Sequence, residues 1–226
     1  KYGVGKTTLV GTAVDVAHMR DVIMISAEGG ELSLYNNPRI KNADLIDVIQ
    51  IRSFTQLHAI REYLAAHVMY RDRGDEENLW RLQKMVFAGT PGAEDGARLR
   101  KYRTVIVDSI TEINDYCLQN LLGMHTGMNL NSDPPTAEFK EYKQNHTKMQ
   151  MFIRQYRDLG MNTLMTAATN FEQDESKKYH YTPAMTGKLS SQIQGVFDIV
   201  GFIAASAATE TSLAPRRLFL QPVGGI

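Results

Sequence analysis

The chain opens with KYGVGKTTL, residues 1–9. Within it, Gly5-Lys6-Thr7 matches the end of the phosphate-binding loop (P-loop), whose full pattern is G-x-x-x-x-G-K-S/T. Backbone N–H groups of such a loop surround the phosphates, while the lysine neutralises the outer phosphates and the hydroxyl binds Mg²⁺. The first glycine of the pattern would precede Lys1, so we expect the sequence to lack a segment before it.

An apolar helix is expected directly after this loop. Within residues 7–19 the apolar side chains recur at helical spacing, which favours a P-loop over an ordinary glycine turn with a surface lysine. Lys6 is the expected source of the charge that offsets the phosphates during catalysis. The residues expected to contact a nucleotide here are Gly3, Val4, Gly5, Lys6, Thr7 and Thr8.

A second motif is the β-branched apolar run TVIVDS, residues 104–109, which closes on Asp108. A hydrophobic strand that ends in an acid after a P-loop is the pattern of a Walker B acid. We expect Asp108 to hold the Mg²⁺ shell together with Thr7, and Ser109 to hydrogen-bond a water or a phosphate oxygen. A simpler interpretation is that Asp108 caps the following helix, and the two roles are compatible.

Strands alternate with helices along the whole chain, which predicts an α/β fold: a P-loop NTPase core with a mostly parallel sheet and helices on both faces. We expect one domain over residues 1–226, continuing beyond Ile226. The expected strands are 21–26, 45–51, 104–109, 162–167 and two late ones near 199–204 and 218–221. The expected helices are 7–19, one capped by Ser53 and Gln56, one after 109, one from a cap at Thr136 to 159, and a short one after 187. The expected irregular stretches are 70–103 with a short helix near 78–85, the linker 123–135, and the polar loop 170–187.

Composition excludes several classes of protein. Because 25 Lys and Arg balance 25 Asp and Glu, the chain lacks the positive field of a dedicated nucleic-acid binder, so DNA contact requires a local patch or an assembly. Cys117 is the only cysteine, so no internal disulfide can form, as suits a reducing cytosol. We find no signal peptide and no apolar run long enough to span a membrane, and we expect a soluble cytoplasmic protein.

Hydrolysis requires a group that orients and deprotonates a water molecule. Glu28 lies at the end of a strand and before two glycines, and Glu31 and Glu112 are its rivals. A polar group that ends the 162–167 strand could sense the γ-phosphate, and the spacing leaves three alternatives open. The histidines show no metal-ligand spacing, so Mg²⁺ brought in with the nucleotide is the only metal expected. The three candidate sensors are Thr166, Thr169 and Asn170.

Two surface stretches suit contact with nucleic acid. One is a cluster of basic residues just before the 104–109 strand. The other is the 170–187 loop, where basic side chains are interspersed with aromatic ones. We expect the loop to be the functional one of the two, because long loops in compact domains are usually working parts or disordered. The cluster comprises Arg98, Arg100, Lys101 and Arg103, and the loop carries Lys177, Lys178, Tyr179 and Tyr181.

A family resemblance emerges from five stretches in order: KYGVGKTTL, VIMISAEGG, YRTVIVDSITEI, MNTLMTAATN and TPAMTGKLSSQIQGVFDIVGFI. The chain resembles phage-encoded ATPases with a RecA-like core, in particular the phage single-strand-annealing ATPases. The resemblance covers most of the chain and is most specific at residues 5–8 and 104–109. It implies a RecA-like fold, ATP and Mg²⁺ as cofactors, and hydrolysis of ATP to ADP and phosphate.

The resemblance also implies roles for individual residues. In RecA-like proteins an acid after the second conserved strand activates water, and Glu28 matches that position, which favours it over its two rivals. Relatives often carry a histidine or glutamate where this chain has Ala168-Thr169-Asn170, so the sensor stays open. Relatives also tend to end with a basic finger that reaches the neighbouring subunit's nucleotide, and Arg216 or Arg217 is the candidate here.

We therefore expect a DNA-dependent ATPase of phage recombination or replication, acting in the cytoplasm of the bacterial host. The loops 123–135 and 170–187 would line a DNA path. The expected partners are the nucleotide, single-stranded DNA, further copies of the chain in a ring or filament, and a single-strand-binding protein. Rival functions are a motor or loader that remodels protein or packages DNA, an assembly protein with little turnover, and, as the weakest, a small-molecule P-loop kinase.

Overall fold

The computed structural model describes residues 4–35, 37–86, 99–124, 131–173, 179–205 and 216–220, with the backbone alone described at 172, 173, 179 and 180. Several predicted site residues therefore lie outside the described residues or have no described side chain. Gly3, Arg98, Lys177 and Lys178 are outside, and Tyr179 is described by its backbone alone.

A four-stranded parallel sheet with strand order β2-β1-β3-β4 forms the centre of the protein. Its strands are β1 (Val22–Ser26), β2 (Ile46–Gln50), β3 (Thr104–Asp108) and β4 (Asn162–Met165). Every residue of β1 and β3 is buried, as expected of central parallel strands that are covered on both faces. The sheet confirms the predicted α/β fold class.

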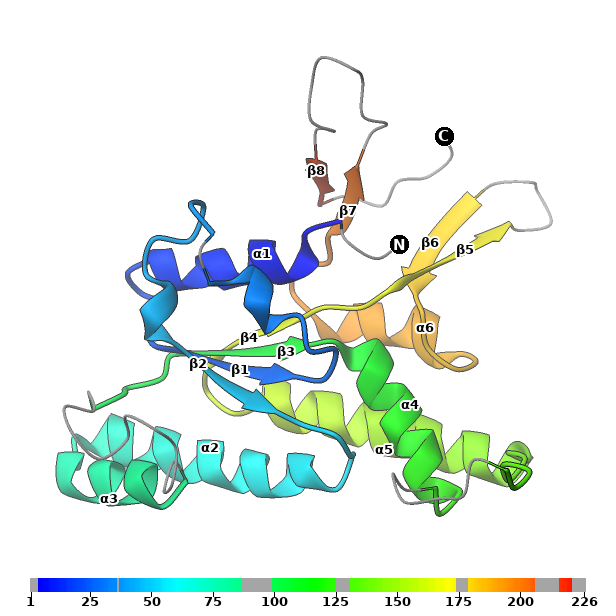
Figure 1. The fold of residues 1–226 in the computed structure, drawn as a ribbon, viewed down its shortest axis with the longest axis horizontal. Coiled ribbons are helices and arrows are strands. Elements are labelled where there is room, and N and C mark those ends of the chain that lie inside the picture. The colour runs from blue at the N-terminus through cyan, green and yellow to red at the C-terminus, as the bar shows by residue number, and fades with distance from the viewer. Residues whose placement is uncertain are drawn as a thin grey trace.

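Helices cover both faces of this sheet (Figure 1). On one face, Ile23, Ile25 and Val107 pack in a core with α2 (Gln56–Arg73), α4 (Ile110–Leu121) and α5 (Phe139–Arg157). On the other face, Val22, Met24 and Ile106 pack with Val14, Leu34 and Ile40, next to α1 (Lys6–Gly11). Alternation along each strand thus divides the apolar side chains between two cores. A further helix, α3 (Glu76–Val86), lies beside α2.

Three predicted helix boundaries were wrong. The helix expected at 7–19 ends at Gly11 and continues as a 3₁₀-helix, Thr12–Asp15, where the Thr12 hydroxyl donates to the Leu9 carbonyl (2.6 Å). The helix expected to start at Thr136 starts at Phe139, because Glu138 and Glu141 form a reciprocal capping box. The irregular stretch expected from residue 70 starts later, because α2 runs to Arg73, and the short helix predicted near 78–85 is found as α3.

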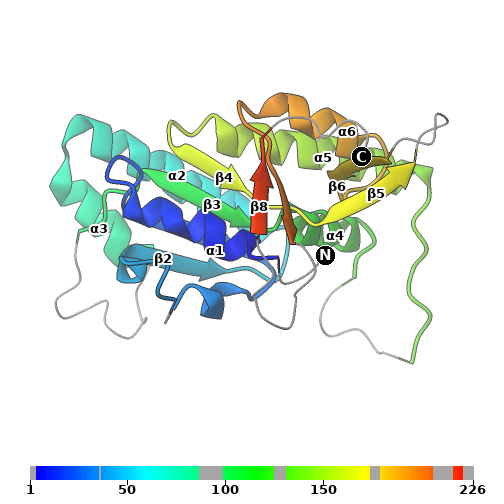
Figure 2. The same ribbon diagram turned by 90° about the horizontal axis from the view of Figure 1, so that it is seen from above.

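The C-terminal part forms two antiparallel strand pairs outside the central sheet (Figure 2). The predicted polar loop 170–187 contains the first pair, β5 (Thr169–Gln173) and β6 (Tyr179–Pro183), in which Phe171 pairs with Tyr181. Their rings lie 5.1 Å apart, and aromatic pairs of this kind favour strands. After α6 (Leu189–Gln192) and a 3₁₀-helix (Ile193–Val196), the two late strands pair with each other as β7 (Phe202–Ala205) and β8 (Arg216–Phe219).

Among the described residues, none of the helices combines the length and the apolar character needed to cross a membrane.

A buried polar network fixes α2 to the start of β3. The Tyr102 backbone N–H donates to His67 Nε2 (2.9 Å), and the Tyr102 hydroxyl donates to Asp47 Oδ2 (2.5 Å). Arg100 forms an ion pair with the same carboxylate (2.8 Å), and Lys101 pairs with Glu76. Two members of the predicted basic cluster are therefore occupied by intramolecular ion pairs, which argues against a DNA-binding role for that cluster.

His67 generates a prediction about stability. Its side chain is fully buried, and burial together with the neighbouring Arg71 lowers its pKa from 6.5 to about 4. Because the unfolded chain takes up this proton first, the folded state loses stability as pH falls from 6.5 toward 4, by up to about 3 kcal/mol. His67→Gln keeps an acceptor for Tyr102 and does not titrate.

Urea unfolding at pH 7 and pH 4.5 measures this effect. The loss of stability between the two pH values should be smaller in His67→Gln than in the wild type. The exposed His58→Gln serves as the matched control and should follow the wild type. Equal pH dependence in all three proteins would contradict a buried neutral His67.

Candidate nucleotide site

The polar residues of the site meet at the carboxyl edge of the central sheet. Ser26 ends β1 and is paired in register with both Gln50 of β2 and Asp108 of β3. Thr166 follows β4 directly, and its backbone N–H donates to the Val107 carbonyl (3.0 Å). Parallel strands place these residues side by side because all their carboxyl ends point the same way.

Asp108 lies at the centre of this edge and is fully buried. The Thr7 hydroxyl donates to its Oδ2 (2.6 Å), and the Thr166 hydroxyl donates to its Oδ1. The P-loop threonine and the Walker B acid, 101 positions apart in the sequence, are therefore in direct contact. Their oxygens form the kind of donor set that Mg²⁺ takes alongside waters and nucleotide phosphates, so the residues fit the ion.

Two glycines shape the space around these oxygens. Gly5 has φ +94°, in the left-handed region that side chains rarely adopt, and it precedes α1 directly. A Cβ at Gly30 would lie 3.4 Å from Thr7 Oγ1 and 3.8 Å from Asp108 Oδ2. The backbone of Gly30 thus lines the same space as the two candidate Mg²⁺ ligands. Val4 of the same loop is buried.

Ser109 contacts Glu28, which differs from the contact predicted for it. The fully buried Ser109 hydroxyl donates to Glu28 Oε1, and Ser109 also caps α4 by accepting the Glu112 N–H (3.5 Å). Its single proton is committed to Glu28, so it orients that carboxylate instead of donating to a phosphate. Ser109 and not Asp108 is the helix cap, and the peptide bond between them is cis.

The two rival acids have different surroundings. Glu31 accepts hydrogen bonds from Ser26 (2.8 Å) and from Gln50. Burial raises its pKa, but its own backbone N–H and these two side chains outweigh burial and lower the pKa overall, which weakens Glu31 as a base. For Glu112, burial and then the charges of Asp115 and Glu28 raise the pKa. Glu28 therefore lies close enough to Glu112 to affect the Glu112 carboxyl electrostatically.

The remaining candidates are more dispersed. Of the three possible sensors, Thr166 binds Asp108, whereas Thr169 and Asn170 lie in β5 and, among the described residues, form no side-chain hydrogen bond with the P-loop or Asp108. Thr8 faces Asn37, whose amide donates to the Thr8 hydroxyl (3.4 Å). Sequence reasoning missed Ser26 and Gln50, although each is a polar residue that ends a strand.

Two other candidate residues, Arg216 and Tyr181, have neighbours that the sequence did not predict. The Arg216 side chain lies against Gly5 of the P-loop in the same chain. The Tyr181 ring, predicted to stack on a base, stacks on Phe202 with a centroid distance of 4.3 Å and stays 41% exposed. Part of that ring is therefore already covered by the protein.

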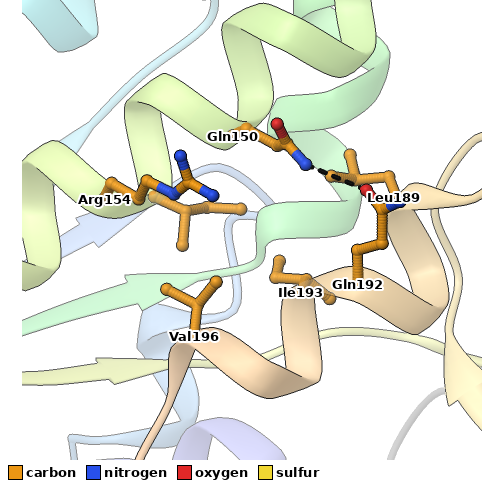
Figure 3. Close-up of a pocket in the computed structure, with 7 residues that line it drawn as sticks. Gln150, Arg154, Leu189, Gln192, Ile193 and Val196 are labelled. Atoms are coloured by element: carbon orange, nitrogen blue, oxygen red, sulfur yellow. Dashed lines mark hydrogen bonds between the residues drawn. The ribbon is translucent and has the colours of Figure 1, made fainter.

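A hollow of about 210 Å³ lies elsewhere, between α5 and the segment around α6 (Figure 3). Ile153, Arg154 and Val196 are among its lining residues, and none of the candidate nucleotide contacts lines it. No group of three or more His, Cys, Asp or Glu side chains that could hold a metal occurs within the described part of the chain. A metal at the carboxyl edge would therefore depend on the nucleotide and water for most of its ligands.

The parallel sheet, the Gly5-Lys6-Thr7 motif and the contact of Thr7 with Asp108 define a P-loop nucleoside triphosphatase core. The chain belongs to the AAA domain family AAA_24, whose model matches residues 1–222. It is therefore an AAA-type P-loop ATPase, a class of nucleotide-binding, nucleotide-hydrolysing proteins. No curated protein sequence matches the chain.

The contact between Thr166 and Asp108 leads to a prediction. Thr166→Val keeps the shape of the side chain but removes the hydroxyl that donates to the buried carboxylate, which should cost about 1–3 kcal/mol of folding free energy. Thr166→Ser retains the hydroxyl and should lose less. Urea unfolding of the three proteins tests this, and equal midpoints for Thr166→Val and Thr166→Ser would show that the hydroxyl does not support Asp108.

Proposed function

We propose that this chain hydrolyses ATP at the carboxyl edge of its sheet, with Lys6 and Thr7 on the phosphates and Mg²⁺, Asp108 in the Mg²⁺ shell, and Glu28 as the base. The observation that carries the proposal is the 2.6 Å hydrogen bond from Thr7 to Asp108, which joins the two nucleotide motifs at one place. Gly3, Val4, Gly5 and Thr8 complete the proposed phosphate loop. Residues 1–226 would act as a single ATPase domain.

Each side chain has a distinct part in the proposed reaction. Lys6 supplies a point charge to the outer phosphates, and Mg²⁺, when bound, would neutralise charge that develops on them. Thr166 and Thr7 fix both oxygens of Asp108, so its carboxylate does not need to reorganise. Ser109 holds Glu28 Oε1, which leaves Oε2 to accept the proton of the attacking water.

Exposure and charge favour Glu28 over its rivals as the base. Glu28 is exposed at the sheet edge, where water reaches it, and it accepts a hydrogen bond from Ser109, the residue next to Asp108. Glu31 uses both carboxylate oxygens in hydrogen bonds to Ser26 and Gln50. Glu112 lies in the first turn of α4, and its backbone N–H is bound to the Ser109 hydroxyl.

We propose single-stranded DNA as the substrate of the ATPase cycle, in phage recombination or replication. Support comes from the resemblance to phage single-strand-annealing ATPases and from the β5–β6 pair, which begins three positions after Thr166. Phe171 of this pair is 56% exposed, and its segment 174–178 carries Lys177 and Lys178. Aromatic side chains next to basic side chains are typical of a site that binds single-stranded nucleic acid.

Net charge adds a condition to this proposal. A chain with 25 basic and 25 acidic residues gains little from counterion release as a monomer. Several copies of the β5–β6 pair facing one strand would overcome this, so DNA binding would require a ring or filament of the chain. Binding would then depend on nucleotide and rise steeply with protein concentration.

The proposed base is tested by Glu28→Gln. The amide can still accept the Ser109 hydrogen bond but cannot accept a proton, so ATP binding should persist while turnover falls by about a hundredfold or more. Phosphate release measures turnover, and a fluorescent ATP analogue measures binding. Glu31→Gln and Glu112→Gln are the matched controls and should retain most of the activity.

Lys6→Ala completes this series, since it should weaken nucleotide binding itself while the protein stays folded. Normal turnover by Glu28→Gln together with loss in Glu112→Gln would move the base to Glu112. Unchanged binding and turnover in a folded Lys6→Ala protein would reject the nucleotide site.

Single-stranded DNA should stimulate ATP turnover, and replacing both Lys177 and Lys178 by Ala should reduce this stimulation and flatten the salt dependence of DNA binding. Turnover without DNA should be nearly unchanged. Lys140 and Lys143, both exposed on α5, provide a control pair with the same loss of charge. Fluorescence anisotropy of a labelled oligonucleotide across a salt series gives the comparison, and equal effects of the two pairs would remove the β5–β6 pair from the DNA path.

A further inference from the structure

The arginine that begins β8 lies on the phosphate-binding loop of its own chain. A Cβ built on Gly5 would lie 3.1 Å from Arg216 Nη1, 3.4 Å from Cζ and 3.5 Å from Cδ. The guanidinium and the end of its stem therefore cover the face of the glycine that precedes Lys6. In both views of the fold, β8 lies beside the N-terminal end of α1 (Figures 1 and 2).

The neighbouring Arg217 lies on the other face of the strand pair. Ala205 is opposite Arg216 and Ala204 is opposite Arg217, and successive side chains of a strand point to opposite faces. Two adjacent arginines of equal charge and similar exposure thus point to different faces, and the three side-chain atoms nearest to a Cβ on Gly5 all belong to Arg216. Arg217 shares its face with Phe219, which is opposite Phe202.

An aromatic stack holds the strand pair in this position. The Phe202 ring stacks on Tyr181 of β6 (4.3 Å, 27° between planes) and lies 6.4 Å from the Phe219 ring. One face of the β7–β8 pair is therefore attached to the β5–β6 pair, while the other presents Arg216 to the P-loop. A fixed strand carries the guanidinium at lower entropic cost than a loop would.

The charge of Arg216 is not neutralised by the described part of the chain. No carboxylate among the described residues forms an ion pair with it, whereas Arg100 is paired with Asp47 and Arg71 with Asp72. A guanidinium beside a phosphate-binding loop has the geometry and the free donors to bind phosphate oxygens with two parallel N–H bonds.

We propose that Arg216 binds the phosphate chain of the nucleotide held by the P-loop of the same subunit. This inference rests on the proposed nucleotide site, and it adds a second cation to Lys6. It replaces the expectation that Arg216 reaches the nucleotide of a neighbouring subunit. Through the stack of Phe202 on Tyr181, the same strand pair connects the phosphates with the proposed DNA-binding pair β5–β6.

Nucleotide binding by Arg216→Ala is the first test. A fluorescent ATP analogue and ADP should bind at least about tenfold more weakly than to the wild type, because a charge-assisted phosphate contact is lost. Arg217→Ala removes the same charge from the adjacent position and should bind within about twofold of the wild type. Adenosine, which has no phosphate, should compete equally well in all three proteins, and thermal melting should confirm that each is folded.

Mixing experiments separate action within a subunit from action between subunits. Arg216→Ala protein retains Glu28, and Glu28→Gln protein retains Arg216. If Arg216 acts within its own subunit, a mixture of the two hydrolyses ATP no faster than the sum of the separate proteins. If it acts on a neighbour, mixed assemblies contain complete sites and turnover recovers, which would overturn the proposal.

The outcomes also distinguish this inference from the proposed function. Weak ATP binding by Lys6→Ala with wild-type binding by Arg216→Ala would overturn the inference and leave the nucleotide site intact. Wild-type binding by both Lys6→Ala and Arg216→Ala would overturn the site and the inference together. Arg216→Lys, which keeps the charge but not the paired donors, should fall between the wild type and Arg216→Ala.

Discussion

The arrangement of the site depends on one buried carboxylate. Asp108 has no exposed surface, and its two oxygens accept hydrogen bonds from Thr7 of the P-loop and from Thr166 after β4. A buried charge is costly unless its lone pairs are satisfied, so the positions of α1, β3 and β4 at this edge are linked through a single side chain. The parallel sheet makes that linkage possible because it brings three strand ends together.

The proposed water-activating part of the site begins one position further along the chain, at Ser109. Ser109 is both the cap of α4 and the donor to Glu28, so the start of this helix and the orientation of the proposed base depend on the same hydroxyl. Glu112 in the first turn of α4 lies close enough for its charge and that of Glu28 to interact. Two acidic side chains with different surroundings thus lie near each other, and only Glu28 is oriented by a hydrogen bond from Ser109.

The C-terminal strand pairs connect the P-loop with an exposed surface of the protein. The β7–β8 pair contacts Gly5 through Arg216 on one face and contacts Tyr181 through Phe202 on the other. The β5–β6 pair continues directly from the segment that carries Thr166. Under the proposed function, nucleotide and DNA would therefore meet the same two strand pairs, and a change in phosphate occupancy would reach the DNA side through packed rings.

The sequence by itself determined the fold class and the two motifs. Each motif is a local pattern that can be found in the sequence directly: a glycine followed by lysine and threonine in the P-loop, and an acid that ends an apolar strand. The strand expected at 104–109 was found as β3, and Thr7 does contact Asp108. Only the tertiary structure decided that Ser109 serves Glu28, that Glu31 is occupied by Ser26 and Gln50, and that Arg216 lies on the P-loop of its own chain. These contacts join residues whose separation in sequence carries no periodic signal. They arise from strand register and from the antiparallel pairing of β7 with β8, which the sequence did not indicate although it predicted two late strands.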